Sequence, residues 1–320
     1  MRIDRLALEN PRTQGPGRRV WYERHNPEHP RRVASLFDRA MRGRAPGTPH
    51  SAIIVGAGAC TEIPLELLAR THSRVVLVDL DALSMERARN ELPSALRPRV
   101  RAVVADITGG VSGKLSALLG TQPWSDLAGL GPAAVIAGAA DCIARCAVPD
   151  PPELAAGLGT FGLVASTMTL TQLFSLPLLD VLDVMAVVAP ALVGEQDADP
   201  RYQAAARDFR RRVALAHLNL LAALLAPGGT GVVATDVTGH LIAPARGPHA
   251  RADRETLPVL PRDTVDPRAE LAARFRVAGP LERWRWLAST PTADRPGREY
   301  DVVGAVFQSR ASRDAGQSAT

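Results

Sequence analysis

The stretch SAIIVGAGACTEIPLELLAR, residues 51–70, followed by VVLVDLDALSMERAR, residues 75–89, decides the fold. An apolar, β-branched run stops at the glycine turn of residues 56–58, and a helical pattern follows it. A second apolar run then ends in Asp79. This order predicts a nucleotide-binding crevice at the carboxyl ends of parallel strands. Asp79 lies about 20 residues past the glycines, where its carboxylate can accept hydrogen bonds from ribose hydroxyls.

The glycine turn does not fit a dinucleotide. A dinucleotide site carries a third glycine in the pattern G-x-G-x-x-G, which lets a helix pack closely under a pyrophosphate. No glycine follows within residues 59–62. Glu62 would also repel a diphosphate at the start of the helix, where bare N–H groups are needed. The same acid would tolerate a ligand that carries a cationic centre and an ammonium group, and S-adenosylmethionine is such a ligand.

A series of motifs resembles, in the right order, those of the class I S-adenosylmethionine-dependent methyltransferases. The motifs are VGAGACTE at 55–62, VDLDALSMERAR at 78–89, VVADITGG at 103–110, FGLVASTMTLTQL at 161–173 and LLAPGGTGVVATDV at 224–237. The hydrophobic stretches near 284–287 and 300–307 resemble the closing antiparallel hairpin of that fold. The match covers roughly residues 50–308 and is to the superfamily, with no single subfamily identified.

The resemblance implies an α/β fold: a doubly wound, seven-stranded, mostly parallel sheet with an antiparallel last strand and a helical N-terminal extension. The apolar runs predict strands near 52–56, 74–79, 100–105, 161–166 and 230–235. We expect an N-terminal arm and helical lid at 1–49 and a catalytic, S-adenosylmethionine-binding domain at 50–308. A helical insertion is expected near 110–160, and a disordered tail at 309–320.

The resemblance also implies which residues hold the cofactor at the first two strands. Gly56 and Gly58 would let the backbone approach the methionine and ribose parts of the ligand. Asp79 would accept hydrogen bonds from the ribose, with Leu80 beside it. Glu62 would orient a water or an amino group near the turn, or else serve as an ordinary first-turn acid of a helix.

The third and fourth strands would complete this cofactor site. Asp106 and the Ile107 backbone would read the edge of the adenine. The alternative for Asp106 is a cap of the turn at residues 108–110. Ser166, at the end of the fourth strand, is a further expected cofactor contact.

The methyl acceptor is expected at the carboxyl ends of the fourth and fifth strands. Holding a nucleophile in line supplies several kcal/mol of the barrier, and a base is needed only when that nucleophile must lose a proton. Thr167 and Thr169 are expected to contact the substrate. His240 is the general-base candidate, or else a loop histidine in water. Asp236 would orient His240, bind a substrate amine or cap the strand.

The segment before the first strand supplies further candidates. Residues 20–44 have a helical pattern, and extra N-terminal helices of this fold often lie across the cofactor cleft. As lid residues, Tyr22 would contact the substrate, and His25 would be a second candidate base. The alternative is that Trp21 and Tyr22 anchor the arm on the domain.

Composition agrees with an enzyme of the cytoplasm. The chain has 320 residues and 46% hydrophobic residues, enough for one large α/β domain. No apolar run reaches the ~18 residues of a membrane span. Three cysteines, Cys60, Cys142 and Cys146, fit neither a disulfide framework nor a zinc site. We therefore expect a reducing compartment, no metal and no membrane.

The charge is uneven along the chain. The net charge is +5, and residues 1–50 hold eleven arginines against five acidic residues. A basic arm could bind nucleic acid phosphates, although it lacks an RNA-binding signature or interleaved aromatic residues.

Together these features predict a methyltransferase that acts on a small molecule. A homodimer is one arrangement that the sequence allows. Three alternatives stay open. One is an RNA methyltransferase that uses the basic arm, another is a nicotinamide-dependent oxidoreductase, and the third is a binding module that keeps the fold without catalysis.

Overall fold

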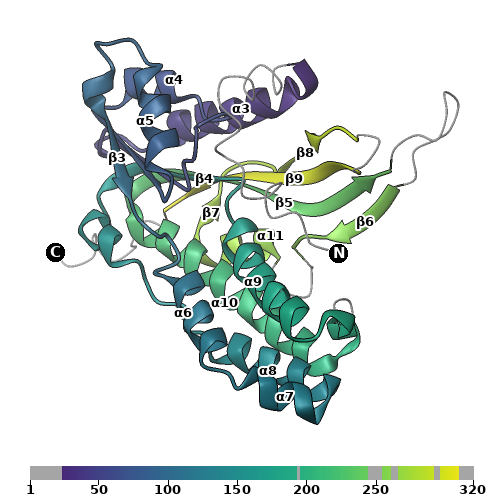
Figure 1. Ribbon diagram of the computed structural model, residues 1–320. Helices are drawn as coiled ribbons and strands as arrows, with labels where there is room; N and C mark the ends of the chain where they lie inside the picture. Colours follow the sequence, from purple (N-terminus) through teal and green to yellow (C-terminus); the bar gives the residue numbers. More distant parts are fainter. Residues whose placement is uncertain (1–23, 193–194, 244–253, 261–265, 292–295, 310–320) are drawn as a thin grey trace, which may run out of the picture.

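The computed structural model describes residues 24–192, 195–243, 254–260, 266–291 and 296–309. They form one sheet with the strand order β3-β2-β1-β4-β5-β9-β7, to which β6 and β8 are added at β5 and β9 (Figure 1). The predicted fold class is confirmed: the first five strands in this order are parallel, and the C-terminal strands are antiparallel. The sheet has nine strands where the resemblance implied seven.

The parallel strands form where continuous apolar runs predicted them. They are β1 (Ser51–Val55), β2 (Arg74–Asp79), β3 (Val100–Val104), β4 (Phe161–Thr167) and β5 (Leu225–Ile242). Every residue of β1 and β4 is buried because helices cover both faces of a parallel sheet. The fifth strand is much longer than the predicted 230–235. Its second half leaves the parallel part of the sheet and pairs with antiparallel neighbours on both edges.

The antiparallel strands account for the difference in strand number. They are β6 (Arg254–Pro258), β7 (Arg276–Val277), β8 (Glu282–Ser289) and β9 (Gly297–Gln308). Residues 241–267 are rich in proline and arginine, which is typical of a loop, but within them β6 pairs with residues 238–242 of β5. The second half of β5 would otherwise be an open edge, and pairing satisfies its backbone groups.

Helices cover the two faces of the sheet. On one face lie α3 (Glu28–Gly43), α4 (Leu65–Thr71) and α5 (Ala82–Asn90), and on the other lie α10 (Pro200–Leu224) and α11 (Pro267–Arg274) (Figure 1). Each helix buries an apolar stripe. The Asp81 side chain accepts a hydrogen bond from the Ser84 N–H at 3.0 Å and so caps α5, as its position before the helix predicts.

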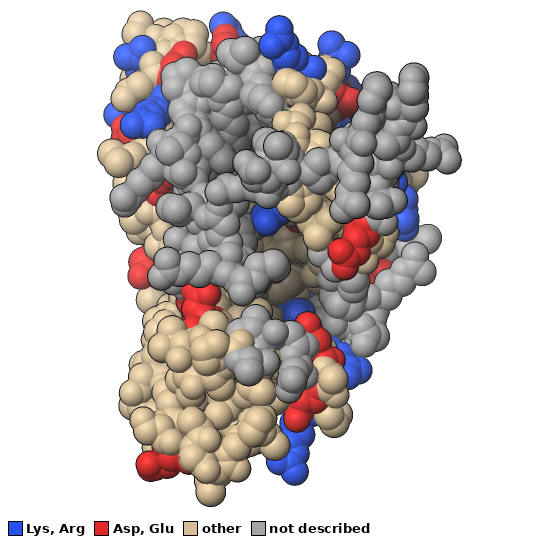
Figure 2. Space-filling model, turned by 45° about the vertical axis from the view of Figure 1, so that its right-hand side comes forward, with Lys and Arg blue, Asp and Glu red and all other residues tan. Residues whose placement is uncertain are grey.

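The predicted helical insertion forms a lobe below the sheet in Figure 1. It consists of α6 (Val111–Gly120), α7 (Trp124–Leu130) and α8 (Pro132–Arg145), which pack with α9 (Gln172–Val188) and α10 into a hydrophobic cluster of their own. Figure 2 shows a broad uncharged area over the left of this lower part of the molecule, with acidic and basic side chains along its right side. The helices of residues 111–145 therefore share one core with α9 and α10.

The described part of the N-terminal segment is packed into the core. α3 buries Val33, Leu36 and Phe37 against the sheet and contacts β5, β8 and β9. Asn26 forms two hydrogen bonds with the backbone of Leu287 in β8, through its side-chain amide N–H and its carbonyl oxygen. α3 is therefore part of the core. The lid function expected of residues 1–49 stays a prediction, and residues 1–23 lie outside the described ranges.

Candidate cofactor and active site

The candidate site lies at the carboxyl ends of β1 and β4, where the strand order reverses. β1 pairs with β2 on one side and with β4 on the other, so the loops after these strands separate. The amides of Gly56 and Ala57 both donate to the Val78 carbonyl, at 2.9 and 3.0 Å. The glycine turn therefore folds over the end of β2, beside the point where α/β sheets of this kind bind ligands in a crevice.

Asp79 links this turn to the next loop. Its Oδ2 accepts a hydrogen bond from the Gly58 N–H at 2.8 Å, and its Oδ1 accepts one from the Asp81 N–H at 2.9 Å. A carboxylate offers about four lone-pair sites, so two remain for further donors such as ribose hydroxyls. The sequence predicted the position of Asp79 at the strand end. The sequence did not predict the hydrogen bonds of Asp79 to the Gly58 and Asp81 amides.

Two glycines give the turn its shape. Gly56 and Gly58 have φ values of +77° and +48°, in the left-handed region that favours glycine. A Cβ on Gly58 would meet no heavy atom within 4 Å. The backbone at Gly58 therefore borders open space, into which a ligand could come close.

Exposed apolar side chains border the crevice at β2 and β3. Leu80, Leu83 and Val104 are 67%, 68% and 56% exposed. All three lie at or just after the carboxyl end of a parallel strand. They offer apolar surface against which a flat heterocycle such as adenine can lie.

Asp106 adopts the second of its two expected roles. Its Oδ1 accepts hydrogen bonds from the Thr108 N–H at 2.8 Å and from the Thr108 hydroxyl at 2.6 Å. The Thr108 hydroxyl in turn accepts from the Val111 N–H at the start of α6. Asp106 therefore caps this turn, while Ile107 beside it is half-buried.

The exit of β4 packs directly on the glycine turn. The Thr167 hydroxyl donates to Glu62 Oε1 at 3.0 Å, and the Thr169 hydroxyl lies 3.2 Å from the Gly56 carbonyl oxygen. Between them, Met168 has a φ of +54°, rare for a residue with a side chain. Such strained positions concentrate at functional sites. The predicted residues Glu62, Thr167 and Thr169 are thus brought together.

Ser166 requires a correction as an expected cofactor contact. Its side chain is 2% exposed, and its hydroxyl lies 2.9 Å from Nε2 of the buried His217 on α10. Burial lowers the pKa of His217 to about 4, so this imidazole is neutral. The Ser166 hydroxyl therefore faces the interior below β4 and does not reach the crevice.

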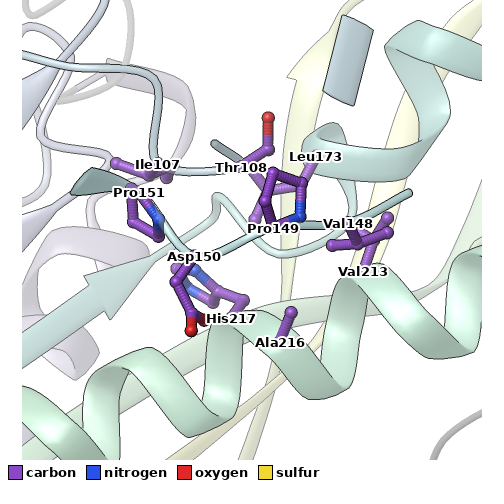
Figure 3. A pocket seen from close by; sticks show the side chains of 10 residues that line it. All are labelled: Ile107, Thr108, Val148, Pro149, Asp150, Pro151, Leu173, Val213, Ala216 and His217. Atoms are coloured by element: carbon purple, nitrogen blue, oxygen red, sulfur yellow. The ribbon is translucent and has the colours of Figure 1, made fainter. Parts of the chain in front are cut away.

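A small pocket lies beside this pair. Figure 3 shows side chains of the loop after β3, the loop after α8 and two helices pointing into it. Its lining residues are Ile107, Thr108, Val148, Pro149, Asp150, Pro151, Leu173, Val213, Ala216 and His217. The insertion thus encloses space next to Ile107, the residue expected to read adenine.

Asp236 is a buried carboxylate at the end of the parallel part of β5. It lies at a β-bulge, where the pairing of β5 with β9 shifts between Asp236 and Thr238. Its Oδ2 accepts a hydrogen bond from the Thr171 hydroxyl at 3.0 Å. Burial raises the pKa of Asp236 to about 6. A carboxylate with a raised pKa at a strand end is a candidate acid or base.

His240 lies farther along β5 and contacts different side chains from those that contact Asp236. Its Nε2 is 2.9 Å from Asp301 Oδ2, and its Nδ1 is 3.4 Å from the Thr256 hydroxyl. Asp301 also accepts from Arg285 at 2.9 Å. The expectation that Asp236 orients His240 is therefore wrong, because each has a different hydrogen-bond partner.

The remaining predicted residues belong to the N-terminal arm. His25 is exposed, and Tyr22 lies outside the described residues. The structure adds Thr171 and Tyr300 near Asp236, which sequence reasoning missed. Thr171 stands in the quoted β4 exit motif, so its position was a usable signal, whereas Tyr300 depends on strand pairing.

In the part of the chain that the structure describes, no group of three or more His, Cys, Asp or Glu residues could hold a metal ion. No described helix is both long enough and apolar enough to span a bilayer.

The strand order is that of a mostly parallel α/β sheet with antiparallel C-terminal strands, the fold class that the sequence motifs implied. No protein-family model and no curated protein matches the sequence. Among solved structures, a SAM dependent methyltransferase from Aquifex aeolicus is similar at 12% identity and a TM-score of 0.39, over 95% of this chain and 98% of that chain. A geranyl diphosphate methyltransferase in complex with SAM is similar at 11% identity and a TM-score of 0.36, over 86% of this chain and 84% of that chain.

A third similar structure is a variant of the 16S rRNA (adenine(1408)-N(1))-methyltransferase from Catenulisporales acidiphilia. It has 17% identity and a TM-score of 0.34, over 89% of this chain and 93% of that chain. At such identities and TM-scores these similarities do not indicate what this chain binds or does.

Proposed function

We propose that the protein is an S-adenosylmethionine-dependent methyltransferase that acts on a small molecule. One observation carries the proposal: the Asp79 carboxylate is fixed to the glycine turn at Gly58 and keeps acceptor capacity toward the crevice. The turn lacks the third glycine of a dinucleotide site, and Glu62 would repel a pyrophosphate.

The described residues fit this cofactor. Asp79 would hold the ribose hydroxyls, and the exposed side chains of Leu80 and Val104 would contact the adenine. The open backbone at Gly58 and the acid Glu62 would face the methionine part, whose ammonium group needs a negative partner. When bound, the cofactor supplies a methyl group on a sulfonium that leaves readily.

The chain's own contribution is then to position the acceptor. The acceptor would lie beyond the β4 exit, on the side of β5, where Asp236 can take a proton. Oxygen and nitrogen acceptors both fit this general scheme. The three described cysteines are unbridged and buried, which fits a reducing compartment such as the cytoplasm.

RNA is the second candidate substrate because of the arginines that precede residue 50. Since α3 belongs to the core, the informative truncation removes residues 1–23 and keeps residues 24–43. RNA binding that falls with salt and disappears in this truncation would favour the RNA methyltransferase over the small-molecule enzyme.

Thermal unfolding with candidate cofactors tests the proposal. A ligand that binds only the folded state stabilises it by ~2.7 kcal/mol at a hundredfold excess over Kd. We expect S-adenosylmethionine and S-adenosylhomocysteine to raise the unfolding temperature by several degrees, and NADH to leave it unchanged. Stabilisation by NADH alone would replace the proposal with the oxidoreductase.

A further inference from the structure

Asp236 is a buried charge without a counter-charge. Its side chain is 9% exposed, and no described Lys, Arg or His forms an ion pair with it. The Thr171 hydroxyl satisfies Oδ2, whereas Oδ1 is buried and has no hydrogen-bond partner among the described residues. A buried carboxylate is costly unless a cation or several donors compensate it. The Asp236 carboxylate therefore has one hydrogen-bond donor and no counter-charge among the described residues, and a positively charged ligand would supply both a donor and the charge.

Aromatic rings lie on the same side of the sheet. Asp236 is opposite Val302 on β9, and Tyr300, two residues from Val302, projects from the same face. The pKa of Tyr300 is raised mainly by burial and, to a lesser extent, by the negative charge of Asp236. The second effect requires the two side chains to be close to each other. The Tyr300 ring stacks on Trp286 of β8, with centroids 5.8 Å apart. A carboxylate beside aromatic faces is the combination that binds ammonium groups.

The position of Asp236 relative to the crevice is also informative. Thr171, its hydrogen-bond donor, belongs to the β4 exit, two residues after Thr169, which packs on the glycine turn. The Met168 amide continues the pairing with β5 by donating to the Ala234 carbonyl at 2.8 Å. The glycine turn and Asp236 therefore both contact the β4 exit, through Thr169 and Thr171 respectively. A methyl donor on the β1 side would have its acceptor on the Asp236 side.

We propose that the methyl acceptor is an amine, bound as its ammonium by the Asp236 carboxylate beside Tyr300. This inference rests on the proposed function and narrows its substrate class. The ammonium gives one proton to Asp236, and the nitrogen lone pair forms the new carbon–nitrogen bond. The carbon–sulfur bond breaks with its electron pair on sulfur. The positive charge passes from sulfur to the methylated nitrogen, and Asp236 then releases its proton to water.

The experiment measures binding of phenethylamine and of the corresponding alcohol, 2-phenylethanol, to the full chain in the presence of S-adenosylhomocysteine. We expect the amine to bind at least tenfold more tightly than the alcohol. Asp236→Asn should remove this preference, because a neutral amide keeps the size of the side chain and the bond to Thr171 but loses the charge. Asp208→Asn, an exposed carboxylate on α10, should leave the preference intact.

Two further readouts keep the test decisive. Asp236→Asn should unfold at the same temperature as the unchanged protein or higher, because it removes a buried charge. Tyr300→Phe should keep the preference, and Tyr300→Leu should weaken it by removing the aromatic face. A wild-type protein that shows no preference for the amine, whether it binds both probes or neither, overturns the inference. S-adenosylhomocysteine affinity, measured in the same samples, separates this failure from failure of the proposed function.

Discussion

Lowering the pH from 7 to 5 is expected to remove roughly 4 kcal/mol of the free energy of unfolding. Three buried histidines, His29, His72 and His217, each have a pKa lowered by burial from 6.5 to about 4. Between these values the unfolded chain binds protons that the folded protein does not. Stability therefore falls as the pH drops through this window, by roughly 2 kcal/mol for each histidine at pH 5.

At His29, a hydrogen bond acts in the same direction as burial. Nδ1 of His29 accepts a hydrogen bond from the Trp284 indole N–H at 2.8 Å, so protonation of that nitrogen would place two donors face to face. Asp236 acts in the opposite direction. The pKa of Asp236 in the folded protein is raised to about 6, so Asp236 binds a proton at a higher pH in the folded protein than in the unfolded chain. This adds about 1 kcal/mol to the free energy of unfolding by pH 5. This gain is included in the net figure.

Urea unfolding at several pH values between about 7.5 and 5 measures this effect. His29→Gln should lower the number of protons taken up on unfolding by about one. A free energy of unfolding that stays constant from pH 7 to 5 would contradict the prediction.

Gly56→Ala is expected to destabilise the fold and abolish cofactor binding. A Cβ at this position would lie 2.3 Å from the Thr169 hydroxyl oxygen and 2.4 Å from its methyl carbon. Thr169 is held by a hydrogen bond to the Thr167 carbonyl, so its side chain cannot move away cheaply. Either the glycine turn or the β4 exit must shift, and the crevice between them would change shape.

Gly47→Ala provides a matched control. Gly47 has a φ of +79°, close to the +77° of Gly56, but a Cβ there would meet nothing within 4 Å. Both variants carry the cost of a left-handed alanine, roughly 1–2 kcal/mol. Gly56→Ala should lose a further ~1–3 kcal/mol through overpacking. Equal unfolding midpoints for the two variants would show that the contact with Thr169 does not constrain the turn.

Local sequence patterns predicted the elements that surround the crevice. The apolar run of residues 75–78 and the acid after it place Asp79 at the end of β2, where the structure has it. The cap at Asp81 is equally local, since its hydrogen bond spans three residues. Such features depend on neighbouring residues alone, which is why a single sequence reveals them.

Pairings between distant residues were beyond such patterns. Ser166 and His217 are 51 residues apart, and His29 and Trp284 are 255 apart. The partner of Asp236 was misassigned to His240 because the two are close in sequence. On an extended strand, residues four positions apart are ~13 Å apart, so a hydrogen bond between them was never within reach.

The extent of the sheet was also underestimated. Residues 254–258 include a proline and two charged residues and show no alternation of apolar and polar residues, so their sequence does not predict a strand. They form β6 because the long β5 offers an unpaired edge. Edge pairing depends on which strand is exposed in the folded domain, and this information is absent from the segment itself.

Isothermal titration of the full chain with S-adenosylmethionine tests the central claim most directly, with Asp79→Asn as the comparison. The asparagine keeps the size of the side chain and one acceptor for the Gly58 amide, but it loses the charge and part of the acceptor capacity. We predict micromolar binding by the unchanged protein and at least tenfold weaker binding by a folded Asp79→Asn. An intact, folded protein that binds no S-adenosylmethionine would contradict the account.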